Sequence, residues 1–310
     1  MIRLGTRASA LARAQAQLVA ERLRAAGAEV ALVPMRTEGD RRLEARLADL
    51  GGKGLFVRDL EVALLEGRLD AVVHSLKDLP AEQPAGLTLA AFLPREDPRD
   101  VLVTRRGRGL DSLPEGAVVG TSSLRRRALL LACRPDLRVV PVRGNVDTRL
   151  ARLARGDWDG LVLAAAGLGR LGLAPEHAEA LPPEVFVPAV GQGILAVQTR
   201  AADPLACRLV GALDDRPARL CAQAERACLR RLGATCATPL AAHAVLDAGR
   251  GPARLALRAV VASEDGRRVL RAESFGDPEE AEAIGRGLAE TLLERGAAEV
   301  AGLAARPGVA

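Results

Sequence analysis

The chain has 310 residues and a mass of 32.5 kDa, enough for two or three domains with a sizeable buried core. Hydrophobic residues make up 49% and charged residues 27%, which excludes a disordered protein, and no apolar run approaches the roughly 20 residues of a membrane-spanning helix. The 44 Lys and Arg against 39 Asp and Glu favour an anionic ligand, whereas the absence of Tyr and the scarcity of Phe and Trp argue against stacking of nucleic-acid bases.

The first two thirds of the chain alternate strand and helix patterns. Strands are predicted at 2–6, 30–35 and 70–74, and helices at 10–27, capped by Ser9, and 58–66. The pattern restarts after the proline-rich segment 94–98, with strands at 100–104, 117–121, 138–142 and 159–164 and helices at 123–132 and 145–155. Alternation of this kind predicts parallel strands with helices on both faces of the sheet.

The last third of the chain has a different pattern. A helix is predicted at 218–232, followed by strands near 241–246, 254–262 and 267–273, and acidic residues at 277–280 begin a C-terminal helix. This order predicts a separate α+β unit.

The five cysteines are an odd number without CxxC spacing, which argues against a disulfide framework and a zinc site. Cys133, Cys207, Cys221 and Cys228 lie in predicted helices, where we expect small core residues. Cys236 lies in a loop, and no His–Asp pair near it in sequence would activate it; His243 is expected to pack in a strand. With no signal-peptide pattern at the N-terminus, we expect a cytoplasmic protein without a metal site.

Several segments place polar or basic residues where a strand ends and a helix begins. Residues 5–9 and 120–123 offer helix N-termini, which bind anions, although ordinary N-caps are the more common explanation of this signal. Residues 122–127 and 142–149 are basic, and guanidinium groups grip carboxylates through paired hydrogen bonds. A solvated basic face is the alternative, but several such clusters at one sheet edge favour a polyanion site.

Two further segments contain the only lysines of the chain. Residues 51–56 form a glycine-rich loop with Lys53, which lacks the spacing of a nucleotide-binding loop. Lys77 and Asp78 leave the end of a predicted parallel strand, the edge at which ligands bind in open α/β sheets. An exposed surface pair is the alternative for Lys77 and Asp78.

Taken together, these segments resemble the porphobilinogen deaminase family, also called hydroxymethylbilane synthases. The resemblance runs from Arg3 to about Val245 and includes GTRASALA, GGKGLF, AVVHSLKDLP, PREDPRDVLV, GTSSLRR, VRGNVDTRL, LAAAGLGRL, VPAVGQG and the loop cysteine. Each segment alone is modest, but their order and spacing are highly specific.

The resemblance implies a transferase of tetrapyrrole biosynthesis. The family joins four porphobilinogen molecules head to tail with loss of ammonia, then hydrolyses the product to hydroxymethylbilane. Growth takes place on a dipyrromethane cofactor held by a thioether, and the matching cysteine is Cys236. Porphobilinogen is therefore the expected partner, with neither nucleic acid nor membrane, and the family leads us to expect a monomer.

The resemblance also assigns roles to single residues. Asp78 matches the catalytic carboxylate. The cofactor-binding positions are matched by Cys236, Lys77, Asp78, Thr121, Ser122, Arg125, Arg126, Arg143 and Gly144. The substrate-binding positions are matched by Arg7, Ser9, Arg149, Arg170, Gln192, Lys53 and Phe56, the last two in an active-site loop.

The fold implied by the resemblance is α/β with three domains. Domains 1 and 2 are expected to be like periplasmic binding proteins, doubly wound with mixed, mostly parallel sheets, and a smaller α+β domain 3 carries the cofactor cysteine. The expected ranges are 1–94 with 194–213, 99–188, and 216–310, and the chain crossovers near 94–98 and 188–193 are expected to act as hinges. The sequence departs from the family pattern at Ala10, at Asp147 and in the loop Ala234-Thr235-Cys236-Ala237.

Two other functions are considered beside this one. A non-catalytic two-lobed module that binds carboxylates would share the architecture but would need neither Asp78 nor Cys236. A basic nucleic-acid binder would show steep salt dependence and normally a recognition motif. Neither accounts for the ordered set of motifs.

Overall fold

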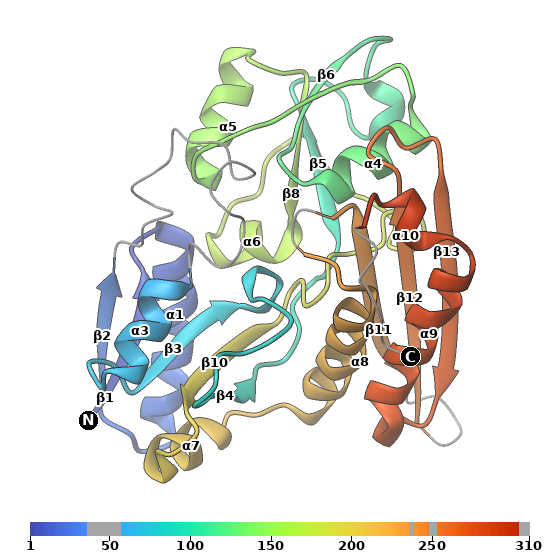
Figure 1. Cartoon of the computed structure of the whole chain (residues 1–310). Coiled ribbons are helices and arrows are strands. Elements are labelled where there is room, and N and C mark those ends of the chain that lie inside the picture. The colour runs from blue at the N-terminus through green and yellow to red at the C-terminus, as the bar shows by residue number, and fades with distance from the viewer. Residues whose placement is uncertain (36–56, 236–237, 248–252, 304–310) are drawn as a thin grey trace.

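The computed structural model describes residues 1–35, 57–235, 238–247 and 253–303, which form three domains, each built on one sheet (Figure 1). The first sheet has the order β2-β1-β3-β10-β4, the second the order β7-β6-β8-β5-β9, and the third the order β11-β12-β13. The predicted class, two α/β domains with mixed, mostly parallel sheets and a smaller α+β domain, is confirmed.

The first domain combines N-terminal elements with a segment that returns from far along the chain. Its strands are β1 (Ile2–Arg7), β2 (Val30–Met35), β3 (Ala71–Ser75), β4 (Leu87–Phe92) and β10 (Leu195–Arg200). Its helices are α1 (Ala10–Ala25), α3 (Arg58–Leu65) and α7 (Pro204–Gly211), and the 3-10 turn η1 (Leu76–Asp78) follows β3. β10 lies between β3 and β4 and runs antiparallel to both, while β1 is parallel to β2 and β3.

The second domain repeats this sheet order. Its strands are β5 (Asp100–Thr104), β6 (Val118–Gly120), β7 (Arg138–Val140), β8 (Gly160–Ala164) and β9 (Ala178–Ala180). Its helices are α4 (Leu124–Cys133), α5 (Val146–Arg155) and α6 (Ala165–Arg170), with a 3-10 turn η2 (Leu110–Ser112). Here β5 is the antiparallel fourth strand, so β5 and β10, the strands that follow the two chain crossovers, occupy equivalent places.

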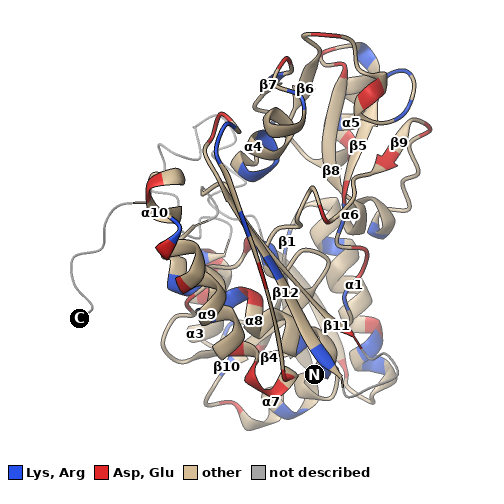
Figure 2. Ribbon diagram, turned by 90° about the vertical axis from the view of Figure 1, so that its right-hand side faces the viewer, with Lys and Arg blue, Asp and Glu red and all other residues tan. Residues whose placement is uncertain are grey.

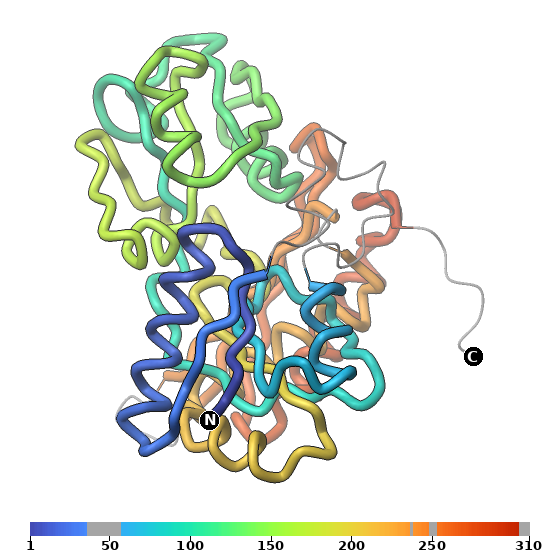
Figure 3. The backbone as a smooth tube through the Cα atoms, turned by 90° about the vertical axis from the view of Figure 1, so that its left-hand side faces the viewer, coloured from blue at the N-terminus to red at the C-terminus, as the bar shows by residue number. Residues whose placement is uncertain are grey.

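The third domain is a three-stranded antiparallel sheet with helices on one face. Its elements are α8 (Arg216–Leu232), β11 (Leu240–Asp247), β12 (Arg254–Ala262), β13 (Val269–Gly276), the 3-10 turn η3 (Pro278–Glu280), α9 (Ala281–Glu294) and α10 (Ala297–Val300). Figure 3 shows this domain beside the other two, with the first domain beneath the second. The predicted C-terminal helix begins with the 3-10 turn η3, which Asp277 caps by accepting from the Glu279 amide, with Pro278 at its first position.

Local signals explain most of the predicted element boundaries. Ser9 caps α1 by accepting a hydrogen bond from the Ala12 amide at 3.3 Å, and Ser123 caps α4 through the Arg126 amide at 3.4 Å. Gly233 ends α8 in the left-handed conformation, at φ +64°. The sequence pattern gives no ranges for β4, β9, β10, α6 and α7, although it predicts a helix around Cys207, which lies in α7.

The third domain packs against both of the others. Ala218 and Ala222 of α8 share an apolar core with Leu76 of η1, so this helix supports the turn that carries Lys77 and Asp78. On the other side, Ala241 of β11 packs with Leu129 and neighbouring residues of the second domain. The third domain therefore connects the other two by burial of apolar surface, through α8 on one side and β11 on the other.

The two crossovers touch at a glycine. Gly193 has a φ of +90°, and a Cβ there would lie 2.3 Å from the backbone oxygen of Glu96 in the other crossover. Glu96 donates its amide to the Gly193 carbonyl at 3.2 Å. Only glycine permits both the backbone conformation and the close approach.

The cysteine prediction is partly wrong. Cys221 and Cys228 are buried on the inner face of α8, as expected, and burial raises the pKa of Cys221 to about 11. Cys207 is half-buried and Cys133 is exposed at the last turn of α4, because an apolar pattern does not say which side of a short helix faces the core. His243 lies buried in β11, as predicted. Within the described ranges, no helix is long and apolar enough to span a bilayer.

Candidate active site

The predicted site residues follow the carboxyl ends of parallel strands in two different sheets. Arg7 ends β1, Lys77 and Asp78 follow β3, Thr121 follows β6 and Arg143 follows β7. Lys and Arg occur throughout the three domains with Asp and Glu among them (Figure 2). Overall charge therefore does not locate the site, and the contacts between particular side chains do.

Lys77 and Asp78 lie on η1, directly after β3. Asp78 is exposed, so its carboxylate is accessible to solvent. Lys77 is half-buried, and its Nζ donates a hydrogen bond to Oε1 of Gln192 at 3.2 Å. Burial and the nearby charge of Arg126 lower the pKa of Lys77 to about 8, against the opposing influence of Asp78 and Asp100.

Arg125 and Arg126 in the first turn of α4 are buried, with exposed fractions of 4% and 8%. Both bind Asp100, the completely buried first residue of β5. Nη1 of Arg125 lies 2.7 Å from Oδ2 of Asp100, and Nε and Nη2 of Arg126 lie 3.0 and 2.8 Å from Oδ1. Burial alone would raise the pKa of Asp100, but the two guanidinium charges hold it well below its usual range.

Gln192 connects this cluster to Lys77. Its Nε2 donates to Oδ1 of Asp100 at 2.9 Å and to the carbonyl of Pro98 at 2.6 Å, while its Oε1 accepts from Lys77. The predicted residues Lys77, Gln192 and Arg126 are therefore joined through Asp100. This chain of contacts brings the strand ends of the first and second sheets together.

Three more predicted residues lie around the second sheet. Gly144 has a φ of +98°, and its carbonyl accepts a hydrogen bond from Nε of Arg149 at 2.7 Å. Burial and the charge of Arg126 lower the pKa of Arg149, which places it in the same electrostatic environment. Nη2 of Arg170 donates to the Gly193 carbonyl at 2.6 Å, which ties the end of α6 to a crossover.

The predicted hydroxyl residues already have structural bonds. The Ser122 hydroxyl donates to the Val142 carbonyl and accepts from the Val142 amide, the latter at 3.0 Å. Thr121 is buried, and its Oγ1 accepts from the Ser123 amide at 3.2 Å. These bonds connect the loops after β6 and β7, while the Ser9 hydroxyl is the N-cap of α1.

Three predicted residues, Cys236, Lys53 and Phe56, lie outside the described residues. Among the described neighbours of Cys236, the Thr235 amide donates to Oγ1 of Thr238 at 3.1 Å. In the sequence, Cys236 lies between α8 and β11.

Sequence reasoning missed two residues at the site. Asp100 was part of a quoted motif but received no role; a carboxylate at the start of an otherwise apolar buried strand was the available signal. Gln15 lies on the buried face of α1, and its Nε2 donates to Oγ of Ser75 at 2.9 Å, directly before η1. A polar residue among apolar ones on the inner helix face was its signal.

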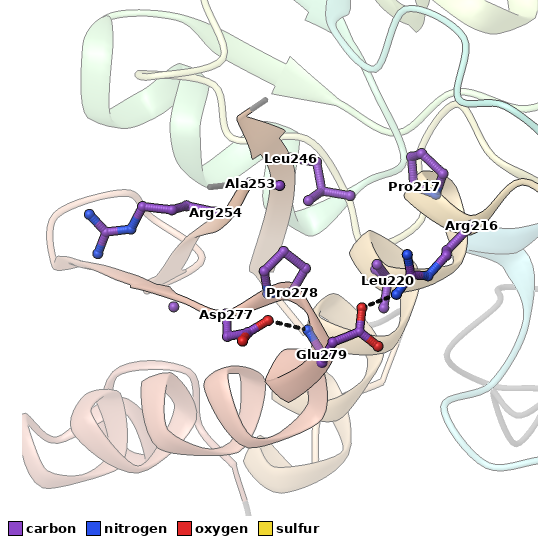
Figure 4. Close-up of a pocket in the computed structure, with 10 residues that line it drawn as sticks. Arg216, Pro217, Leu220, Leu246, Ala253, Arg254, Asp277, Pro278 and Glu279 are labelled. Atoms are coloured by element: carbon purple, nitrogen blue, oxygen red, sulfur yellow. Dashed lines mark hydrogen bonds and ion pairs between the residues drawn. The ribbon is translucent and has the colours of Figure 1, made fainter. Parts of the chain in front are cut away.

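A separate pocket of about 640 Å³ lies in the third domain, between the start of α8, the facing ends of β11 and β12, and η3 (Figure 4). Leu220, Leu246 and Pro278 supply much of its apolar lining, and Arg216 pairs with Glu279 at its rim. None of the predicted site residues that the structure describes lines it. This pocket is therefore distinct from the strand-end site.

Comparison with known proteins identifies the family. Residues 2–207 match the family described as porphobilinogen deaminase, dipyromethane cofactor binding domain, and residues 219–294 match porphobilinogen deaminase, C-terminal domain. The porphobilinogen deaminase of Syntrophotalea carbinolica is 48% identical over 298 residues, covering 96% of this chain and 93% of the relative.

Solved structures with similar folds include two transport proteins. A periplasmic substrate-binding protein of an ABC transporter from Coxiella burnetii is 20% identical, with a TM-score of 0.41, covering 72% of this chain and 95% of that one. A putative periplasmic sulfonate-binding protein from Methylobacillus flagellatus is 16% identical, with a TM-score of 0.38, covering 72% of this chain and 67% of that one. The family matches and the sequence relative, which span nearly the whole chain, show that it belongs to the porphobilinogen deaminase family.

Proposed function

We propose that the strand-end site described above performs the family's reaction in this chain, with Asp78 as its catalytic carboxylate. The reaction condenses four porphobilinogen molecules head to tail on a covalent dipyrromethane primer, releases one ammonia per addition and ends with hydrolysis to hydroxymethylbilane. The observation that carries the proposal is the bonded path from Lys77 through Gln192 and Asp100 to Arg126, which joins the motifs of two domains.

The chemistry explains the need for an exposed carboxylate beside cationic groups. Loss of ammonia from porphobilinogen leaves an azafulvenium cation, and Asp78 stabilises this positive charge as it develops. The same carboxylate can move a proton on the leaving amine or on the attacked ring. Asp78 is exposed on the 3-10 turn η1, and α8 packs against Leu76 of the same turn. The carboxylate is therefore accessible to a substrate without rearrangement of the apolar core.

The residues present fit a primer and a substrate that carry several carboxylates. Arg149 and Arg170 are half-buried, and the buried Nε of Arg170 has no hydrogen-bond partner among the described residues, although it lies 4.0 Å from Oε1 of Glu96. A buried donor of this kind accommodates an anionic ligand well, because an acceptor there would satisfy it. When bound, the primer supplies the pyrrole carbon on which the chain grows.

We propose that the remaining predicted residues divide between primer and substrate. Cys236 would hold the primer through a C–S bond, formed from its thiol and the aminomethyl carbon of porphobilinogen with release of ammonia. Arg143, Gly144, Thr121 and Ser122 would hold the primer through side-chain or backbone donors. The substrate groups would meet Arg7, Ser9, Arg149, Arg170 and Gln192, with Lys53 and Phe56 from the loop before α3.

The intact mass of the purified protein tests this function. The expected added mass equals two porphobilinogen units less two ammonias, and a Cys236→Ser variant should lack it. If neither the purified protein nor apoprotein incubated with porphobilinogen gains this mass, the primer assignment is wrong and the carboxylate-binding module becomes the better description.

Asp78→Asn tests the catalytic role. We expect a folded protein whose turnover falls by about 10²- to 10⁴-fold, the range typical for loss of a catalytic acid–base or electrostatic group. Asp157→Asn is the matched control, because Asp157 is an exposed carboxylate that pairs with Arg152 at 2.7 Å and lies outside the site and the crossovers. Near-normal turnover of Asp78→Asn would reject the role of Asp78.

We also propose domain ranges of 1–94 with 194–213, 99–188, and 216–310, hinged at the two crossovers, in a cytoplasmic monomer that binds neither nucleic acid nor membranes. The two equivalent sheets and the contact of Gly193 with Glu96 support the crossover positions. The described cysteines are free thiols, which supports a reducing compartment. Sedimentation at several concentrations tests the monomer, and limited proteolysis tests the domain limits.

A further inference from the structure

Asp100 occupies an unusual position for a residue without an assigned role. It is completely buried at the junction of two domains. Four donor atoms bond to its carboxylate and one bonds to its backbone oxygen. Its side chain accepts from Arg125, Arg126 and Gln192, and its backbone oxygen accepts from the Leu181 amide at 2.8 Å. No other carboxylate in the described part of the chain bonds to either arginine.

The geometry fixes both guanidinium groups. Arg126 presents Nε and Nη2 to one oxygen of Asp100, and its Nη1 donates to the Val162 carbonyl at 2.9 Å. Arg125 presents Nη1 to the other oxygen and donates to the Val187 carbonyl at 2.8 Å. Each guanidinium is thus held between a carboxylate and a backbone carbonyl, which leaves its plane little freedom to rotate.

Charge gives Asp100 a second effect. Two guanidinium groups side by side in a buried place repel each other, and one carboxylate between them offsets that repulsion. The cluster then keeps one net positive charge, to which Lys77 adds when it is protonated. Two arginines that are already held in place bind carboxylates better than two mobile arginines, because less side-chain conformational entropy is lost on binding.

We propose that Asp100 is a positioning residue that orients Arg125 and Arg126, and through Gln192 also Lys77, for assembly of the primer. The inference rests on the proposed role of the two arginines in binding the primer. Asp100 itself does not touch the reacting atoms. Its effect is to hold the donors in place and to link the strand ends of the two sheets.

The test compares Asp100→Asn with Asp70→Asn in the full-length apoprotein. Asp70 is a matched control, because it also binds two arginines, Arg3 at 2.6 Å and Arg200 at 3.4 Å, but lies at the opposite end of β3 from Lys77. The readout is the rate at which the intact mass gains two porphobilinogen units less two ammonias, measured over a range of porphobilinogen concentrations. Melting temperature is measured for each variant in parallel.

We expect Asp100→Asn to slow this gain by about 10- to 100-fold, the effect of losing hydrogen bonds to charged partners, while Asp70→Asn leaves it unchanged. Asp100→Glu keeps the charge and should load faster than Asp100→Asn, even where the longer side chain lowers the melting temperature as much. A purely structural role would instead make loading follow melting temperature across all three variants, and that result would overturn the proposal.

Arg126→Leu distinguishes the proposed role of Arg126 in primer binding from the proposed positioning role of Asp100. If Arg126→Leu gains the mass normally, the arginine role itself is wrong. If Arg126→Leu fails to gain it and Asp100→Asn gains it at the normal rate, the arginine role stands and the positioning role of Asp100 is rejected.

Discussion

Glu225 on α8 offers a sharp test of what holds the three domains together. Its side chain is completely buried and accepts from Nη2 of Arg95 at 2.5 Å in the first crossover. It also accepts from the Gly191 amide at 2.6 Å in the second crossover and from the Ala244 amide at 2.7 Å in β11. One carboxylate therefore bonds to both crossovers and to the third sheet.

The expected cost of Glu225→Gln follows from these bonds. Glutamine keeps the shape of glutamate and one acceptor oxygen, but its NH₂ group would face an N–H donor in place of the second carboxylate oxygen. Arg95 would also lose its buried counter-charge. Breaking a buried pair from one side costs about 3 to 5 kcal/mol. Because glutamine retains part of the bonding, we take about 3 kcal/mol, which for 310 residues corresponds to a drop in melting temperature of about 4 to 5 °C.

Calorimetry of the full-length protein measures this change. The matched control is Glu279→Gln, because Glu279 pairs with Arg216 in an exposed ion pair of the same domain, and such pairs contribute little. The double variant Arg95→Gln/Glu225→Gln should lose less than the sum of the single variants, since the two residues act as one pair. A shift for Glu225→Gln no larger than that of the control would refute the reasoning.

Two further predictions concern pH. Burial lowers the pKa of His74 to about 4, and its Nε2 lies 3.0 Å from Oε1 of Gln198, so the folded protein keeps His74 neutral where the unfolded chain takes up a proton. Stability should therefore fall as pH drops from about 6.5 to about 4, by up to about 1.4 kcal/mol per pH unit for this group. Denaturant titrations at several pH values should show a smaller loss of stability in His74→Gln than in the parent protein. The control variant His177→Gln should lose as much stability over this range as the parent protein does. Lys77, with a pKa of about 8, should lose its charge as pH rises above 8. The rate of primer loading, measured by intact mass, should therefore decrease above pH 8 in the parent protein but persist to higher pH in Lys77→Arg, because arginine stays protonated. Identical dependence of the loading rate on pH in the two proteins would contradict this.

The sequence predicted the local elements well because their signals are local. Ser9 and Ser123 are N-caps that the structure confirms, and the alternation of apolar residues located β1, β5 and β8 to within a residue or so. The pattern alone predicted parallel strands throughout. Insertion of β10 antiparallel to β3 depends on residues more than a hundred positions apart, such as Leu195 opposite Ser75, and no local pattern encodes that pairing.

The sequence motifs predict candidate site residues, but they do not predict the contacts between them. The basic residues of α4 were correctly placed at a helix start, yet the pattern gave no sign that two of them are buried against Asp100. Burial of a charge is a property of the tertiary structure, and the partner lies 25 positions before Arg125 on another element. The sequence pattern therefore indicates candidate cations but not the buried carboxylate that bonds to them.

This distinction changes how substitutions in the family motifs should be interpreted. Arg126 is at once a proposed ligand for the primer and half of a buried ion pair, so Arg126→Leu removes a binding group and also leaves Asp100 buried with fewer partners. Loss of loading in that variant alone does not separate the two effects. Arg149, whose Nε bonds only to the Gly144 carbonyl among the described residues, has no buried carboxylate partner there, so Arg149→Leu should reduce loading with a smaller loss of melting temperature.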